Sequence, residues 1–230
     1  MNKFVQISIM TATLLATGAF AQKAGDNIIG VGIASINPNV SMGTVTSNSP
    51  TFQGALIGSS ADIAPTTTLS VGWLHMYTDN FGVEVTIGIP PKLIVDLNAP
   101  ATHATYPGAS SAKSLSPTAV AKYLFRTSTD QLRPYLGLGV THASFKSIAA
   151  NTADPTVNAM AGTSASLSAS WAPVYNAGVI YNIDDKWSIN ASISYIPIKT
   201  TATFIGSGAV TSGDLTINPT DYVIRLGNRF

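Results

Sequence analysis

Eight segments of this chain alternate apolar and polar residues with a period of two, which is the pattern of β-strands. The links between them alternate strictly between long and short, and the long links are rich in Ser, Thr, Gly, Ala, Asn and Pro. Strict alternation implies an even number of antiparallel strands, with both chain ends on the side of the short turns. A β-sandwich gives no reason to sort its connections by length. The predicted strands span 27–37, 66–77, 81–91, 115–125, 133–146, 166–181, 187–199 and 214–230, and the long links lie near 38–65, 92–114, 147–165 and 200–213.

Composition distinguishes a membrane barrel from soluble and helical membrane proteins. Charged residues make up 10% of the chain, whereas soluble domains carry roughly 25%. A membrane helix needs about 20 consecutive apolar residues, and no long apolar run follows the first 20 residues. A barrel strand needs an apolar residue only at every second position, on its lipid face. The sequence therefore predicts an all-β fold, an eight-stranded antiparallel transmembrane β-barrel with short periplasmic turns and long extracellular loops. A secreted soluble β-sandwich is the alternative.

Residues 1–21 have the layout of a signal peptide. Lys3 supplies the positive end, an apolar stretch follows, and Ala19 and Ala21 are the small residues at the two positions that the peptidase reads. We therefore expect cleavage after Ala21 and a mature barrel over 22–230. A single membrane anchor is the alternative, but the stretch is short and no strong basic stop follows it. The export signal and the barrel together predict the outer membrane of a Gram-negative bacterium.

The last predicted strand ends on an aromatic residue, Phe230. Apolar side chains occupy alternate positions before it, at Leu226, Ile224 and Tyr222, although Asn228 interrupts the face. This ending resembles the recognition signal of outer-membrane proteins, so we expect the barrel-assembly machinery to bind at Phe230. The net charge of +1 gives nothing that would attract nucleic acid.

Short motifs along the mature chain resemble, in order, the outer-membrane protein W (OmpW) family of small barrels. That resemblance implies an eight-stranded barrel with a narrow, largely apolar interior that binds or passes small hydrophobic molecules. The sequence departs from the family at Pro173 inside the sixth strand, at Thr220 where tryptophan is usual, and at Thr86 where a bulky aliphatic residue would constrict the lumen. The motifs are TDNFGVE at 78–84, RPYLGLG at 133–139, SW at 170–171, GV at 178–179 with Tyr181, Trp187, Asn190, Ser192, Tyr195, TTA at 200–202, NP at 218–219 and RF at 229–230.

The strand parity places an ionic layer in the lumen near the periplasmic end. Glu84 is the only glutamate of the chain and lies a few residues above the first short turn. Lys122 lies at a similar height on the neighbouring strand, and Arg225 lies near the same end of the last strand. Because an unpaired buried carboxylate is costly, we expect the three side chains to pair. Such a layer either only fills and rigidifies the lumen or also blocks passage straight through it.

Small or apolar residues above this layer predict a ligand cavity inside the barrel, since an eight-stranded lumen has room for side chains or one small ligand. Trp171 is a candidate for the mouth of the cavity if Pro173 marks a bulge that turns it inward, whereas simple parity places it outside. Pro173 has no N–H for a neighbouring strand, so it is also the predicted weak point for lateral exit. The other predicted lining residues are Thr86, Thr118, Val120, Tyr135, Gly137, Gly139 and Ser192.

The predicted function is binding or conduction of small hydrophobic molecules through the lumen, with lateral exit into the bilayer. The alternatives are a structural barrel with a filled lumen and a lipid-modifying barrel hydrolase. For the latter, His142 and Ser144 have the spacing of the lipid A deacylase family, but the third, acidic residue is missing, because Asp154 lies in a loop. We therefore predict no enzymatic activity, no cofactor and no metal site. The expected partners of the monomeric barrel are outer-membrane lipid and small hydrophobic molecules.

Overall fold

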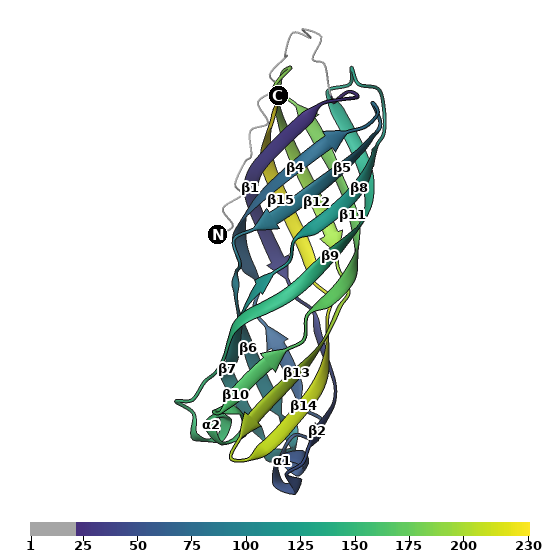
Figure 1. Ribbon diagram of the computed structural model, residues 1–230. Helices are drawn as coiled ribbons and strands as arrows, with labels where there is room; N and C mark the ends of the chain where they lie inside the picture. The colour runs from purple at the N-terminus through teal and green to yellow at the C-terminus, as the bar shows by residue number, and fades with distance from the viewer. Residues whose placement is uncertain (1–21) are drawn as a thin grey trace, which may run out of the picture.

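The computed structural model describes residues 22–230, which form a closed β-barrel extended at one end by two further sheets (Figure 1). The predicted signal peptide at 1–21 lies outside the described residues. Every strand of the wall is antiparallel to both of its neighbours. In order round the wall, the strands are β1 (Asn27–Asn37), β4 (Thr66–Met76), β5 (Phe81–Gly88), β8 (Thr118–Leu124), β9 (Leu132–Ala150), β11 (Ser170–Asn182), β12 (Trp187–Tyr195) and β15 (Thr220–Arg229).

The first and last strands of the wall pair with each other, which confirms the predicted closure. β1 and β15 are in register from Ile28 opposite Arg229 to Asn37 opposite Thr220, and β9 pairs with β11 to complete the circle. In lipid an open edge would leave backbone N–H and C=O groups without partners. The pairing of β1 with β15 removes this edge.

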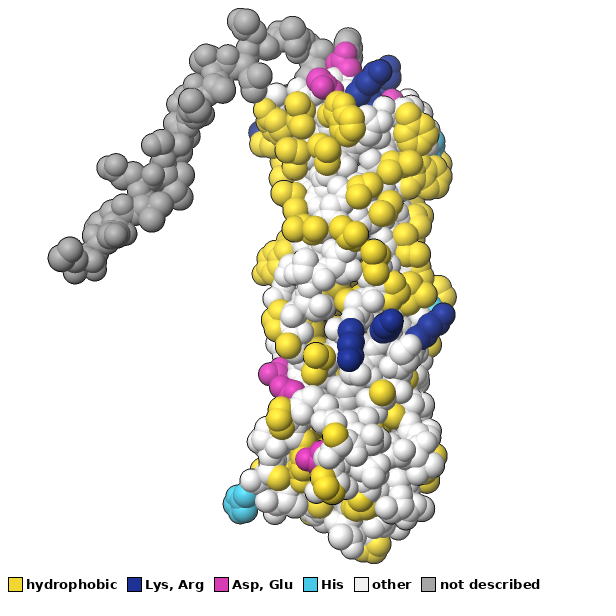
Figure 2. Space-filling model, turned by 90° about the vertical axis from the view of Figure 1, so that its left-hand side faces the viewer, with side chains coloured by type: hydrophobic (Ala, Val, Ile, Leu, Met, Phe, Trp, Pro, Cys, Tyr) yellow, Lys and Arg dark blue, Asp and Glu magenta, His cyan; other side chains and the backbone are white. Residues whose placement is uncertain are grey.

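The outer face of the wall is apolar, as the period of two requires. In β5, Val85 and Ile87 are 46% and 52% exposed on the outer face, whereas Glu84, which points into the lumen, is 7% exposed. Figure 2 shows hydrophobic side chains covering most of the height of the wall on one side. Exposed aromatic residues lie at both ends of this belt, as in the interfacial girdles of membrane barrels. Tyr123, Phe125 and Trp187 lie near the short turns, and Tyr195 and Tyr222 at the opposite end.

The long links were expected to be loops, and this expectation was wrong for much of their length. They fold into seven further strands that continue the barrel outward, with two short helices and one 3-10 turn (Figure 1). One group pairs with the upper part of β9, and the other forms a separate four-stranded sheet. None of the helices within 22–230 is long and apolar enough to cross a membrane. The elements are β2 (Val40–Ser47), α1 (Pro50–Ala55), β3 (Ser60–Ile63), β6 (Lys92–Ala99), η1 (Pro100–Thr102), β7 (Ala104–Leu115), α2 (Pro155–Ala161), β10 (Ser164–Leu167), β13 (Ile198–Gly206) and β14 (Ala209–Ile217).

The strand order is β9-β7-β6-β3 in one of these sheets and β10-β13-β14-β2 in the other. Their inner faces carry apolar residues at alternate positions, for example Leu93 in β6 and Ala202 in β13, which are 7% and 4% exposed. Small polar residues on the outer faces hide this alternation, because Ser and Thr are common in both loops and strands. The extracellular part is therefore a folded structure with its own apolar interior.

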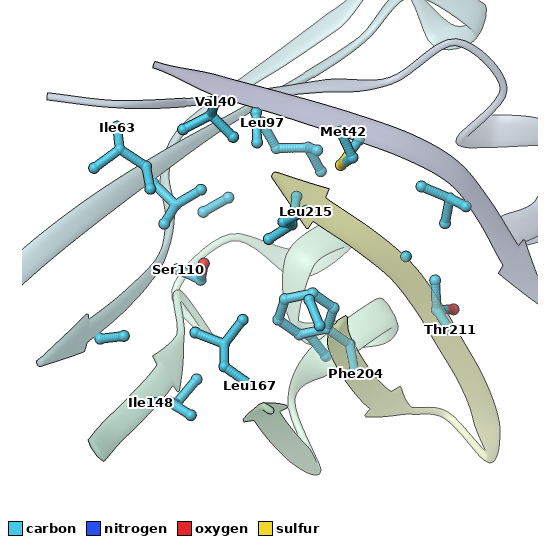
Figure 3. A pocket seen from close by; sticks show the side chains of 18 of the residues that line it. Val40, Met42, Ile63, Leu97, Ser110, Ile148, Leu167, Phe204, Thr211 and Leu215 are labelled. Carbon is cyan, nitrogen blue, oxygen red and sulfur yellow. The ribbon is translucent and has the colours of Figure 1, made fainter. Parts of the chain in front are cut away.

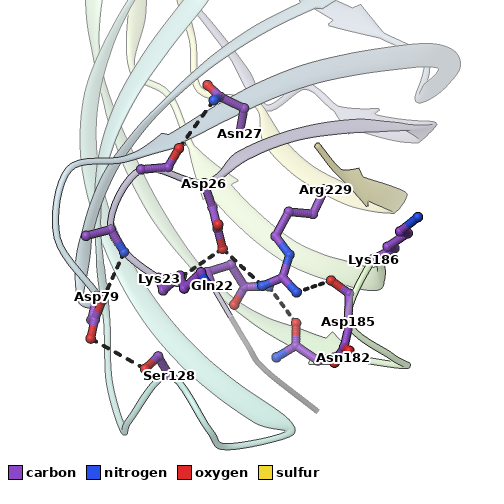
Figure 4. Close-up of polar contacts among 12 residues, drawn as sticks. Gln22, Lys23, Asp26, Asn27, Asp79, Ser128, Asn182, Asp185, Lys186 and Arg229 are labelled. Atoms are coloured by element: carbon purple, nitrogen blue, oxygen red, sulfur yellow. Dashed lines mark hydrogen bonds and ion pairs between the residues drawn. The ribbon is translucent and has the colours of Figure 1, made fainter.

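Polar contacts tie the short turns to the first described residues at the periplasmic end (Figure 4). Gln22 Nε2 donates a hydrogen bond to Asn182 Oδ1 at 2.6 Å, and Arg229 forms an ion pair with Asp26 at 3.0 Å. Asp79 Oδ1 accepts a hydrogen bond from the backbone N–H of Ala24 at 2.9 Å. The two turns that carry Asp79 and Asn182 are thereby both held to the first described residues.

Candidate functional site

The predicted ionic layer is present in the lumen. Lys122 Nζ lies 2.7 Å from Glu84 Oε2, and Arg225 Nη1 lies 2.9 Å from Glu84 Oε1. All three side chains are less than a tenth exposed. Arg225 also donates to Ser70 Oγ, from Nη2 at 2.7 Å, and to Thr86 Oγ1 at 3.2 Å. One carboxylate thus faces two cations, which gives the layer a net charge of +1.

Tyr135 belongs to this layer and does not line a cavity above it. Its ring lies 4.4 Å from Lys122 Nζ in a cation–π contact, and its hydroxyl accepts a hydrogen bond from that nitrogen at 3.3 Å. The hydroxyl donates in turn to Asn190 Oδ1 at 2.9 Å. The side chain is large and 1% exposed, so it completes the barrier across the lumen.

The lumen below the ionic layer is closed by the start of the described chain. Arg133 is fully buried and donates a hydrogen bond from Nη1 to the carbonyl oxygen of Gln22 at 2.6 Å. Only about 20 Å³ of free volume remains between this contact and the layer above it. A solute therefore has no open passage straight through the barrel.

A luminal pocket of about 130 Å³ lies above the ionic layer. Four residues predicted to line the cavity, Thr86, Thr118, Val120 and Ser192, do line this pocket. Much of its wall is nevertheless polar. The acceptor oxygens Oδ1 of Asn176 and Oδ1 of Asp221 are buried and receive no hydrogen bond from the described residues. This pocket suits water or a polar group better than an alkyl chain.

Gly137 and Gly139 were expected to leave room for a ligand, and the structure corrects this. A Cβ atom at Gly139 would lie 2.2 Å from the carbonyl oxygen of Ala119. At Gly137 it would lie 2.7 Å from Cγ1 of Val120 and 3.2 Å from Oδ1 of Asn176. Neighbouring groups already occupy the space beside both glycines. The glycines let these groups approach the backbone of β9, and neither lines the luminal pocket.

Trp171 does not line the mouth of a cavity, because the chain has no bulge at Pro173. β11 and β9 stay in continuous register from Ser170 opposite Ala143 to Tyr181 opposite Leu132. Trp171 consequently follows simple parity and points outward, 69% exposed, with its ring centroid 4.8 Å from that of His142. Pro173 is exposed on the same outer face.

A second, strongly apolar cavity lies between the two extracellular sheets (Figure 3). Its volume is about 120 Å³. Met42, Phe204 and Leu215 face it from the sheet of β10, β13, β14 and β2, and Leu97 faces it from β6 of the other sheet (Figure 3). Sequence reasoning missed these residues because it treated their segments as loops. The alternation of Leu93, Val95 and Leu97 was the signal that could have identified an inward face.

A layer of packed aliphatic side chains separates the extracellular cavity from the luminal pocket. Val174 and Ile196 line the luminal pocket, whereas Ile63, Leu93 and Ile217 line the extracellular cavity. All five are 7% exposed or less and belong to one buried cluster. The two spaces are therefore separated by side chains alone, and no strand of the wall lies between them.

The wall has a break in pairing beside the luminal pocket, between β5 and β8. The two strands pair from Phe81 opposite Tyr123 to Thr86 opposite Thr118. Beyond that point, the segment after β5 and the segment before β8 are joined again by a backbone hydrogen bond from Ser114 N–H to the Pro91 carbonyl oxygen at 3.2 Å. Prolines at 90, 91 and 117 supply no N–H within this interval. The luminal pocket extends to it, since Ile89, Pro91, Ser114 and Ser116 are among its lining residues.

His142 and Ser144 do not form part of a catalytic triad. The ring of His142 packs against that of Trp171 at a tilt of 53° on the outer face of the wall, and the hydroxyl of Ser144 donates to the carbonyl oxygen of Leu115 at 3.0 Å. Asp154 Oδ1 accepts hydrogen bonds from Thr156 and Val157 at the start of α2. Each of the three groups is therefore engaged in a separate structural contact.

Comparison with known proteins assigns this arrangement to a family. The model of the OmpW family matches residues 23–230. Outer membrane protein W of Salmonella typhimurium is 31% identical over 231 residues, which cover both chains completely. Outer membrane protein AlkL of Ectopseudomonas oleovorans is 25% identical over 182 residues, covering 76% of this chain and 70% of AlkL. The crystal structure of the outer membrane protein OprG from Pseudomonas aeruginosa superimposes with a TM-score of 0.80 at 26% identity, covering 92% of this chain and 99% of OprG. All three of these proteins are named as outer membrane proteins.

Proposed function

The chain belongs to the OmpW family of outer-membrane barrels, and we propose that it takes up small hydrophobic molecules at its extracellular end and releases them sideways into the membrane. The observation that carries the proposal is the apolar cavity between the two extracellular sheets. An apolar solute gains roughly 25 cal/mol for each Å² of surface that it hides from water. A cavity whose wall is almost entirely carbon can capture such a solute before it reaches the lipid.

The ionic layer supports exit through the wall. Glu84, Lys122 and Arg225 form a paired and buried set below the luminal pocket, and separating those charges to admit an apolar molecule would cost several kcal/mol. The aliphatic layer above the luminal pocket needs only side-chain rotation. A solute that passes that layer therefore meets polar groups below and the gap between β5 and β8 beside it.

Two positions are candidates for the lateral exit. At Pro173 the wall keeps its register with β9, although pairing with β12 begins only at Tyr175. Between β5 and β8 pairing stops at Thr86, and Ile89 beside this gap is 59% exposed to the lipid side while it also lines the luminal pocket. The second position joins the pocket to the outside more directly, so we favour it over Pro173. A structural barrel with a filled lumen is the alternative to both.

Binding to the apolar cavity is expected to depend on the length of the alkyl chain. We expect the affinity of n-alkanols for the barrel in nanodiscs to rise about fourfold for each added methylene, which corresponds to about 0.8 kcal/mol. The rise should stop when the cavity is full. Displacement of a fluorescent apolar probe measures this, and empty nanodiscs of the same lipid provide the correction for partitioning. An affinity that does not change with chain length would rule out an apolar cavity as the binding site.

The position of the exit can be tested with two matched variants. Ser116→Trp places a bulky ring at the gap between β5 and β8, and we expect it to slow transfer of an apolar probe into the bilayer roughly tenfold while binding persists. Pro173→Ala returns an N–H to β11 and should leave transfer unchanged. Stopped-flow transfer into vesicles containing a membrane quencher measures both. The reverse result, with slowing only in Pro173→Ala, would move the exit to Pro173.

A further inference from the structure

Three lysines lie side by side on the outer face of the extracellular end. Lys92 of β6 is directly opposite Lys113 of β7, and Lys113 is directly opposite Lys146 of β9. Residues opposite each other on neighbouring antiparallel strands have Cβ atoms about 5 Å apart. All three side chains are exposed. A row of basic side chains is visible beside the hydrophobic belt (Figure 2).

The three side chains point away from the interior. Leu93, next to Lys92, and Ala112, next to Lys113, are 7% and 3% exposed and line the apolar cavity. Phe145, next to Lys146, also lines that cavity. Because successive residues of a strand face opposite sides, the lysines must face outward.

The cluster has no acidic counterpart among the described residues. The ion pairs of Glu84 and Asp26 lie in the lumen and at the periplasmic end, and none of them involves Lys92, Lys113 or Lys146. The nearest acidic residue on the outer face of β6 is Asp96, four residues from Lys92, which is roughly 13 Å along a strand. Asp96 Oδ1 accepts a hydrogen bond from the backbone N–H of Gly108 at 2.6 Å, and Asp62 lies opposite Asp96. Like charges directly opposite one another destabilise a sheet, so an anion bound beside the lysine row would offset this repulsion.

The height of the cluster indicates where that partner lies. Along the outer face of β9, Leu136, Leu138 and Val140 are 57%, 67% and 43% exposed, as expected for residues in lipid. His142, which packs against Trp171, follows as an interfacial aromatic pair. Lys146 comes four residues later. The lysines therefore stand just beyond the apolar belt, at the level of the headgroups of the outer leaflet.

We propose that Lys92, Lys113 and Lys146 form a binding site for the phosphate groups of lipopolysaccharide in the outer leaflet. The outer leaflet of a Gram-negative outer membrane consists of this phosphorylated glycolipid, so its phosphates lie at the membrane surface beside an acyl region that contacts the belt. Clustered basic residues next to a membrane-spanning segment attract anionic headgroups. The three ammonium groups on adjacent strands offset the charge of two phosphates. The phosphates in turn offset the repulsion among the three lysines.

The test compares two variants that remove equal charge. In Lys92→Gln/Lys113→Gln/Lys146→Gln, we expect affinity for bisphosphorylated lipid A in detergent micelles to fall about tenfold or more. The control, Lys23→Gln/Lys186→Gln/Lys199→Gln, removes three exposed lysines from the periplasmic end and from β13 and should retain binding. Native mass spectrometry counts the bound lipid, and the thermal midpoint should rise on adding lipid A to the parent and the control only. Without lipid, the cluster variant should be at least as stable as the parent, because the repulsion is gone.

Several results would overturn the proposal. Undiminished binding by the cluster variant would exclude the lysines, and an equal loss in the control would reduce the effect to net charge. Equal binding of lipid A stripped of its phosphates would assign the affinity to the apolar belt. Binding of inorganic pyrophosphate as tight as that of lipid A would identify a site for soluble phosphate. None of these outcomes bears on the apolar cavity, so the proposed function is tested separately.

Discussion

Glu84→Gln is expected to destabilise the barrel by about 3–5 kcal/mol. The substitution leaves Lys122 and Arg225 buried beside each other without the carboxylate that both contact, at 2.7 and 2.9 Å. Glutamine can accept a hydrogen bond, but it carries no charge to compensate two cations. Equilibrium unfolding in urea, with the barrel in lipid vesicles and heat-modifiable gel mobility as the readout, measures the loss.

Lys122→Met is the matched control for Glu84→Gln. It removes one of the two cations and leaves the pair of Glu84 and Arg225 with the hydrogen bonds from Arg225 to Ser70 and Thr86. Methionine fills a similar space, so the loss should stay below about 1.5 kcal/mol. Equal losses in the two variants would mean that packing governs the stability of this layer and that its charge balance does not.

Leu215→Asp is expected to weaken binding of an apolar probe at the extracellular end by at least about tenfold, or 1.4 kcal/mol. Leu215 faces the cavity between the two sheets (Figure 3). A carboxylate there stays hydrated, and an apolar ligand would have to displace that water. The wall of the barrel should persist, because β14 pairs only with β13 and β2. Probe fluorescence measures the binding, and gel mobility measures the fold.

Two controls separate charge in the cavity from damage to the sheet. Thr216→Asp introduces the same charge at the next residue, which is absent from the cavity wall, and should leave binding unchanged. Leu215→Met keeps the volume and the apolar character and should also bind. Unchanged binding in Leu215→Asp would place the ligand elsewhere, and the proposed uptake at the extracellular end would then fail.

The alternation of residues along each strand predicted which side chains face the lumen and which face lipid, because this alternation depends only on the local geometry of an extended chain. A period of two placed Glu84 inside and Val85 outside, and the same counting put Trp171 on the lipid side. The suggested bulge at Pro173 was the error, since proline removes a donor without shifting the register. The need to close a sheet in lipid then required β1 to meet β15, and both the fold and its membrane followed from the order of long and short links.

Features that depend on contacts between distant segments were decided by the tertiary structure. Gly137 and Gly139 suggested free space, but the cross-strand register brings Val120 and Ala119 against them. The apolar cavity exists because two sheets built from four separate links face each other, and no local pattern states which faces will meet. The lysine row likewise joins positions 92, 113 and 146 through the register of three strands. Local alternation determined the side to which each residue points, whereas only the pairing of remote strands determined which residues it would meet there.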